Sequence, residues 1–271
     1  MTEPARLPSL VLRLLAMALG TSQIQAACAY SPPPLPNSGQ AAETLGKGKL
    51  SVAAEAGFGT TASWWNASDP TEVDLNNGWV GAGRLRLGLF ESIDVGLVGG
   101  YGPQNTFVAG PELKWRFAHV APEGDPDGPA FHAAWVSGLG IGASDDYDPN
   151  DPNVRETNLF MAPYTGVVGS GGVHAAQMFA GFRFAASETF GNELQDLTLY
   201  PILSFGFQFR PVEDWTIYAE TDLAGGLTTY DFDDSALLFY PSAGLSFSFD
   251  APWSRAPLRT SENKPTGGRP H

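Results

Sequence analysis

The sequence predicts an all-β fold, on the evidence of its composition and of a repeated alternation of apolar and polar residues. The chain has 271 residues, of which 32 are Gly and 12% are aromatic. An interior Gly destabilises a helix by about 1 kcal/mol, so this Gly content favours strands and turns. Only 16% of the residues are charged, against about 25% in an ordinary soluble domain. The net charge of -14 argues against nucleic acid as a partner, because phosphate binding needs clustered Lys and Arg.

The first 27 residues are predicted to be a signal peptide. Arg6 and Arg13 supply positive charge, residues 14–20 form a short apolar segment, and small residues follow it before Cys28. Spanning a bilayer takes about 20 apolar residues, so this segment is too short to be a transmembrane helix. The chain is therefore expected to be exported.

Cys28 is the only cysteine, so it cannot form a disulfide within the chain. It follows Ala26 and Ala27, and its position resembles the lipidated first residue of a mature bacterial lipoprotein. Gln25 departs from that motif, which usually has Leu there. The alternative is ordinary signal cleavage that leaves a free thiol. Residues 28–48 contain the run Ser-Pro-Pro-Pro-Leu-Pro and are predicted to form a Pro-rich periplasmic tether.

Residues 49–249 repeat one pattern, in which alternate residues are apolar over long runs and turn-forming residues separate the runs. In the last run Phe239 and Leu245 share one face of a strand, and Ser246 lies on the other. We count ten such strands, with eight or twelve also compatible, and the two faces of 157–168 are the hardest to distinguish. In chain order the predicted strands lie near 50–58, 79–87, 92–101, 107–117, 129–142, 157–168, 174–185, 199–210, 215–222 and 237–249.

Alternation alone fits both a soluble sandwich and a membrane barrel, and three observations favour the barrel. Runs of up to 14 residues exceed the soluble strand of about 5 to 6 and suit a tilted membrane strand of about 9 to 11 with extensions. The polar faces carry Gly, Ser and charges of both signs, as a crowded lumen would. Trp79, Tyr101, Trp115 and Trp215 lie near run ends, as interfacial aromatic girdles do. The sequence therefore predicts an antiparallel up-and-down transmembrane β-barrel.

The last predicted strand is similar to the C-terminal assembly signal of bacterial outer-membrane β-barrel proteins. That signal has a polar residue, then Gly, then two aromatic or apolar residues, which here are Ser242, Gly244, Phe247 and Phe249. The resemblance implies the outer membrane of a Gram-negative bacterium, with its lipid and its assembly machinery as partners and no cofactor. One departure is that residues 250–271 follow the signal; they are Pro-rich and basic and are predicted to form a disordered periplasmic tail.

With both ends periplasmic, the strand number must be even and the connections alternate between the two sides. We expect outer loops at 60–76, 144–156, 187–195 and 228–234, and short inner turns at 91–92 and 211–214. Two connections fit this scheme poorly. The link at 102–105 is short for an outer loop, and the link at 120–128 is long for an inner turn.

Charged residues on the polar faces are expected to point into the lumen. They could line a selective path, but a barrel of eight strands has an interior just wide enough for side chains to fill. Buried charges need partners. We therefore expect opposite charges to pair and fill the lumen, and we regard a narrow path for solutes as the weaker interpretation. The residues are Glu55, Arg84, Arg86, Asp94, Glu112, Lys114, Arg116, Arg183, Arg210, Glu220 and Asp222.

The predicted outer loops are acidic, and Asp145, Asp146, Asp148 and Asp151 are close enough in sequence to suggest a site for Ca²⁺ or Mg²⁺. Their spacing matches no EF-hand loop, and a solvated acidic loop is the stronger interpretation. The sequence carries no P-loop, zinc-protease or nucleophile-elbow motif, so we expect no enzyme. The predicted function is a structural or surface-interaction role. A narrow pore or transporter, and an exported soluble β-protein tethered by lipid, are the alternatives.

Overall fold

A computed structural model describes residues 41–63, 78–102, 105–122, 128–148, 151–190, 197–228 and 236–253. Within these ranges the chain forms ten strands and no helix long and apolar enough to span a membrane. The predicted number of strands is confirmed. The strands are β1 (Lys49–Ser63), β2 (Gly78–Phe90), β3 (Ile93–Gly102), β4 (Thr106–Val120), β5 (Ala130–Asp148), β6 (Asp151–Val173), β7 (Ala176–Phe190), β8 (Leu197–Val212), β9 (Trp215–Thr228) and β10 (Ala236–Asp250).

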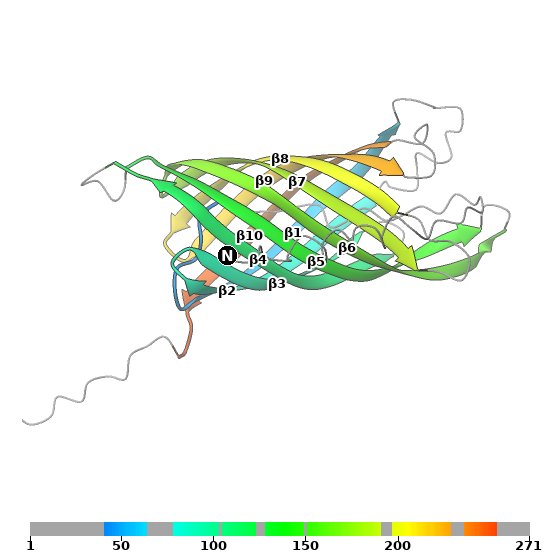
Figure 1. Cartoon of the computed structure of the whole chain (residues 1–271), viewed down its shortest axis with the longest axis horizontal. Helices are drawn as coiled ribbons and strands as arrows, with labels where there is room; N and C mark the ends of the chain where they lie inside the picture. The colour runs from blue at the N-terminus through cyan, green and yellow to red at the C-terminus, as the bar shows by residue number, and fades with distance from the viewer. Residues whose placement is uncertain are drawn as a thin grey trace, which may run out of the picture.

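The ten strands form one closed antiparallel barrel in which each strand pairs with its neighbours in sequence (Figure 1). The barrel closes where β1 pairs with β10, from Lys49 opposite Asp250 to Ser63 opposite Ala236. Closure leaves no free sheet edge in the wall. The amide of Ala251 donates to the carbonyl of Gly48 at 2.8 Å, so the first and last strands begin and end at the same end of the barrel. The predicted up-and-down barrel is confirmed.

The alternation in the sequence becomes an alternation between the outside and the inside of the barrel. On β1, Val52 and Phe58 are 49% and 43% exposed, whereas the intervening Glu55 is 8% exposed. The same holds on β8, where Leu203 and Phe205 lie outside and Ser204 is buried. Successive side chains of a strand point to opposite faces, so each strand places its apolar residues outside and its polar residues in the lumen.

The connections define a turn end and a loop end of the barrel. The turn end carries the tight links at 91–92, 174–175 and 213–214, together with residues 48 and 251. The connection at 121–129 also lies at this end and is long, whereas the link at 103–105 lies at the loop end and is short. Asn105 adopts a positive φ of 52° there, a conformation that Asn tolerates in a tight turn.

The prediction of a loop over 144–156 is wrong, because β5 and β6 continue pairing through most of it. Asp145 lies opposite Thr157 and Tyr147 lies opposite Arg155. The neighbours β4 and β7 end their pairing with this hairpin at Ala143 and Leu159, so the hairpin extends past the wall at the loop end (Figure 1). Pairing between two antiparallel strands has overridden the low strand propensity of a sequence rich in Asp, Asn and Pro.

Residues 41–48 differ from the expected extended tether. Ala41 and Ala42 are 3% and 0% exposed and pack against Ala134, Val168 and Phe179, which line the barrel interior. The segment then turns at Gly46, whose φ is +85°, and enters β1. The predicted signal peptide, Cys28 and the rest of the tether lie outside the described residues, as does the predicted tail beyond residue 253.

Candidate functional site: the barrel lumen

The structure places the lumen candidates on the inward faces of seven strands. Nine of them are less than a tenth exposed, and Arg116 and Arg210, close to the turn end, are partly exposed. The structure thus gathers residues that lie far apart in the sequence. The nine buried residues are Glu55, Arg84, Arg86, Asp94, Glu112, Lys114, Arg183, Glu220 and Asp222.

Opposite charges pair in the middle of the lumen. Arg183 on β7 donates a 2.8 Å hydrogen bond to the carboxylate of Asp222 on β9. Arg84 on β2 has its Nε 3.5 Å from the Glu112 carboxylate on β4. Each pair connects two strands that flank a third, β8 in the first case and β3 in the second, so the charged groups meet over the inward face of that middle strand. A buried charge without a partner is strongly destabilising, and this pairing compensates it.

Two tyrosines donate hydrogen bonds to carboxylates of this layer. The hydroxyl of Tyr164 donates to Glu112 at 2.7 Å, and the hydroxyl of Tyr218 donates to Glu55 at 3.2 Å. Tyrosine hydroxyls buried in this way usually find such a partner. The sequence analysis did not single out either residue, since a Tyr on an inward face gives no sign of which carboxylate it reaches.

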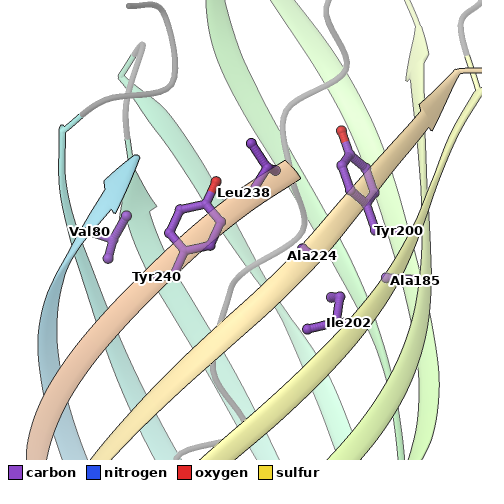
Figure 2. Close-up of a cluster of buried hydrophobic side chains, with 7 residues drawn as sticks. All are labelled: Val80, Ala185, Tyr200, Ile202, Ala224, Leu238 and Tyr240. Atoms are coloured by element: carbon purple, nitrogen blue, oxygen red, sulfur yellow. The ribbon is translucent and has the colours of Figure 1, made fainter. Parts of the chain in front are cut away.

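Apolar side chains fill the lumen nearer the loop end. Figure 2 shows them reaching into the interior from β2, β7, β8, β9 and β10. Tyr200, Leu238 and Tyr240 are each at most 2% exposed. Water-accessible surface is therefore nearly absent at these side chains. The cluster comprises Val80, Ala185, Tyr200, Ile202, Ala224, Leu238 and Tyr240.

The N-terminal segment, residues 41–46, fills the lumen at the turn end. Lys114 Nζ donates to the carbonyls of Ala41 and Glu43, the latter at 2.6 Å. The Ala42 amide donates to Ser170 Oγ at 3.1 Å, and the Leu45 amide donates to both oxygens of Asp94, at 3.1 and 3.2 Å. The segment is thus held through its backbone by side chains of β3, β4 and β6.

Glu43 gives the N-terminal segment its one ion pair among the described residues. Its carboxylate accepts a 2.5 Å hydrogen bond from Arg210 on β8 and a 3.4 Å one from Gln177 on β7. Burial raises the pKa of Glu43, but the charge and hydrogen bond of Arg210 outweigh it, so the net pKa lies below the ordinary Glu value. The carboxylate is therefore charged at neutral pH.

Cationic and aromatic side chains surround the rim of the turn end. Arg116 donates to the Glu91 carbonyl at 2.9 Å, and Arg210 also reaches His174. His119 and His132 lie opposite each other on β4 and β5 with stacked rings and their Nδ1 atoms 3.2 Å apart. A hydrogen bond between these two nitrogens requires one of them to donate and the other to accept.

The four residues of the predicted assembly signal lie on β10, two of them on its lumen side and two toward the outer surface. Ser242 is buried in the lumen and Gly244 lies under the ring of Tyr218. Phe247 lies on the outside, with its ring centroid 5.2 Å from that of Trp215 and 5.7 Å from that of Phe249. The two aromatic residues thus extend an aromatic surface near the turn end. Recognition by the assembly machinery stays a prediction.

The predicted cation site is only partly within the described side chains. Asp145 accepts hydrogen bonds from Asn105 at 2.8 Å and from Thr157 at 3.2 Å, which tie the base of the β5–β6 hairpin to the β3–β4 turn. The side chains of Asp146, Asp148 and Asp151 lie outside the described part. Among the side chains that are described, no group of three His, Cys, Asp or Glu residues is placed to hold a metal ion.

The outer surface and the lumen together define the class of protein. A closed antiparallel barrel of ten strands carries apolar and aromatic side chains outside, such as Leu97, Phe107 and Ile141, and paired charges inside. Water would not favour that outer surface, whereas a bilayer would, because apolar side chains cover it and the strands pair with one another all around the closed wall. The chain has the fold of the small transmembrane β-barrels of bacterial outer membranes. In such barrels the short turns lie at the periplasmic end, so we expect the turn end to be periplasmic and the loop end to face outward.

Solved outer-membrane barrels are similar to this chain over most of its length. The N-terminal barrel domain of OprF from Pseudomonas aeruginosa is 10% identical with a TM-score of 0.38, covering 75% of this chain and 99% of that one. The outer membrane protease OmpT of Escherichia coli is 10% identical with a TM-score of 0.40, covering 77% and 100%. An outer membrane channel of Pseudomonas putida F1 is 13% identical with a TM-score of 0.40, covering 77% and 98%. No family model matches the sequence, and no curated protein is significantly similar to it.

Proposed function

We propose that the protein is a closed outer-membrane barrel with a structural or surface-interaction role, and that its lumen does not conduct solutes. The observation that carries this proposal is that three successive layers occupy the interior. The N-terminal segment lies at the periplasmic end, paired charges lie in the middle, and the apolar cluster of Figure 2 lies toward the outside. A path for ions would have to pass all three.

The part available for a surface role is the loop end. The β5–β6 hairpin extends past the wall there, and among the residues that the structure describes no strand pairs with its outer edges beyond Ala143 and Leu159. Exposed strand edges are natural surfaces for contact with other molecules. Outer-membrane lipid surrounds the barrel in this proposal, and divalent cations bridge the acidic hairpin to anionic lipid.

A narrow pore is the second candidate, because charged residues rather than Ser and Gly alone line the middle of the lumen. Single-channel recording in planar bilayers separates the two functions. The proposed function predicts no steady conductance from the folded protein, with an open outer-membrane channel as the positive control. Stable, ion-selective conductance would show that the charges line a path and would overturn the proposal.

We also propose that the barrel is not an enzyme. The three histidines of the described chain lie at the periplasmic end, where His174 contacts Arg210 and the other two pair with each other. None of the three therefore lies beside the outer hairpin. Hydrolysis of a peptide library or of outer-membrane lipid by the folded protein, above that of a heat-unfolded sample, would contradict this.

A further inference from the structure

The periplasmic end of the lumen has the chemistry of a peptide-binding site. Lys114 donates to two carbonyls two residues apart, Ser170 accepts an amide between them, and Asp94 accepts another three residues further on. These hydrogen bonds go to backbone amides and carbonyls, so they recognise a peptide backbone and not a particular side chain. Two buried side chains, Ala41 and Ala42, occupy a small apolar pocket formed by Ala134, Val136, Val168 and Phe179.

The site also selects charge. Arg210 and Gln177 converge on the Glu43 carboxylate, which lies directly after the two alanines. The chemistry of the site therefore suits a peptide with two small residues followed by an acidic residue, bound with a bend at the second small residue as at Ala42. In this structure residues 41–45 of the same chain supply that peptide.

The occupant is attached to the wall differently from the strands. Residues 41–45 form no strand and are not part of any ladder of the barrel. Side chains of five different strands hold them, and the Thr44 hydroxyl donates to the Glu91 carbonyl at 2.7 Å. The side chains buried deepest are two methyl groups, so little apolar area opposes release. Barrel closure does not depend on the segment, since β1 pairs with β10 and β2 beyond it.

We propose that residues 41–45 are a dissociable ligand of a peptide-binding site at the periplasmic end, and that the site exchanges them for a periplasmic peptide of the same chemistry. Release leaves Lys114, Arg210 and Arg116 at the opening, so the vacated site attracts an acidic peptide. The inference stands apart from the proposed surface role, because an exchanging segment and a non-conducting lumen are compatible.

The test uses the full chain, folded in detergent micelles, with Cys28→Ser and Ala42→Cys as the single thiol. Ala42 is 0% exposed, so a maleimide reagent reaches the new thiol only when the segment leaves. The probe is a synthetic peptide with the sequence of residues 39–46, and a scrambled peptide of the same composition is its control. Thr44→Cys, at a second buried position of the segment, repeats the measurement if Ala42→Cys disturbs folding.

Exchange predicts that the peptide raises the labelling rate, that the scrambled peptide does not, and that replacing Glu with Gln in the peptide weakens its effect. Lys114→Met should raise the rate without peptide by about tenfold or more, because hydrogen bonds to a charged donor are the stronger ones. Lys47→Met removes the same charge from an exposed residue and should leave the rate unchanged. A slow rate that neither the peptide nor Lys114→Met alters, in a folded barrel, would mean that the segment is a fixed part of the wall and would overturn the proposal.

Discussion

The ring of Tyr218 lies over Gly244, so that a Cβ at position 244 would come within 2.6 Å of the Tyr218 Cζ and hydroxyl. The same hydroxyl donates to Glu55. On the other side of the lumen Tyr164 lies over Gly138 in the same way, with its Cζ 2.4 Å from the position of a Cβ. Each Gly thus leaves room for a ring whose hydroxyl partners a buried carboxylate, and this gives Gly244 a packing reason in addition to its place in the assembly signal.

Gly244→Ala should destabilise the folded barrel by about 1 to 3 kcal/mol, the usual range for overpacking. The new methyl group would meet both Tyr218 and the backbone carbonyl of Ala54, and that carbonyl cannot move out of the way. The midpoint of thermal unfolding in detergent measures the change. Gly225→Ala is the matched control, since its Cβ would lie 3.6 Å from Pro201 in ordinary contact. Equal midpoints for the two variants would contradict the ring-over-glycine explanation.

Leu203→Arg should impair folding into bilayers by about 2 to 4 kcal/mol, because it places a charge on the lipid face near mid-height of β8. Leu203 is 45% exposed on the outside. Val212→Arg is the depth control, because Val212 ends the same strand beside the periplasmic turn and a charge near the interface is destabilising by only about 0 to 1 kcal/mol. Reversible unfolding from lipid vesicles measures both. If the two variants fold equally well, the outer surface does not face lipid at that depth.

The alternation of apolar and polar residues was sufficient to predict the ten strands and the apolar face of the clearest of them, although the two faces of 157–168 were hard to distinguish. The reason is that a membrane barrel has lipid on one side and packed polar groups on the other, so the period of two persists along every strand. For the β5–β6 hairpin the prediction had strands only at 129–142 and 157–168, because beyond the wall there is no lipid to impose alternation. Its pairing follows from the partner strand, which a single-strand pattern does not contain.

The N-terminal segment could not be predicted in the lumen. Residues 41–46 have no strand period and follow a Pro-rich run, which favours an extended tether in isolation. Their position depends on Lys114, which the sequence marks only as one more inward charge. Backbone carbonyls accept its hydrogen bonds, and a carbonyl has no side-chain signature. The one indication in the sequence is that β4 carries two inward basic residues, Lys114 and Arg116, but one inward acidic residue, Glu112. This surplus of positive charge indicates that the basic residues need further hydrogen-bond acceptors.

Mass spectrometry of the protein purified from outer membranes tests lipidation of Cys28. A mature N-terminus at Cys28 carrying acyl chains is expected, and Cys28→Ser should either accumulate the precursor or divert it to ordinary cleavage. A stable anchor needs more than one acyl chain, and the barrel itself already fixes the protein in the membrane. Loss of the lipid should therefore leave membrane localisation intact. An N-terminus at Ala27 with an unmodified thiol would refute lipidation.

Acid should weaken the hold on the N-terminal segment. The pKa of Glu43 is lowered in the folded protein, so its ion pair with Arg210 stabilises the folded state above the pKa of an unfolded Glu, about 4.3. That contribution falls as the pH drops through the lower folded value. Labelling of the Cys28→Ser, Ala42→Cys protein should accordingly become faster below about pH 4. The labelling rate at each pH is divided by the rate of the same reagent with a free thiol at that pH. Glu43→Gln should remove this acid dependence and label faster at neutral pH. An acid dependence that survives Glu43→Gln would assign the effect to another group.

Glu112→Gln should lower the thermal stability in detergent, because it removes the negative charge beside Arg84 in the middle of the lumen. The amide oxygen can still accept the Tyr164 hydrogen bond, so the change isolates the charge. Arg84 and Glu112 are 6% and 5% exposed, and breaking a buried pair is destabilising by about 3 kcal/mol or more. Glu213→Gln, in an exposed periplasmic turn, makes the same chemical change and should shift the unfolding midpoint little.

Both variants and the parent should show no steady conductance. If Glu112→Gln changed ion selectivity and left stability unaltered, Glu112 would line a path, and the pairing of charges would not be what closes the lumen.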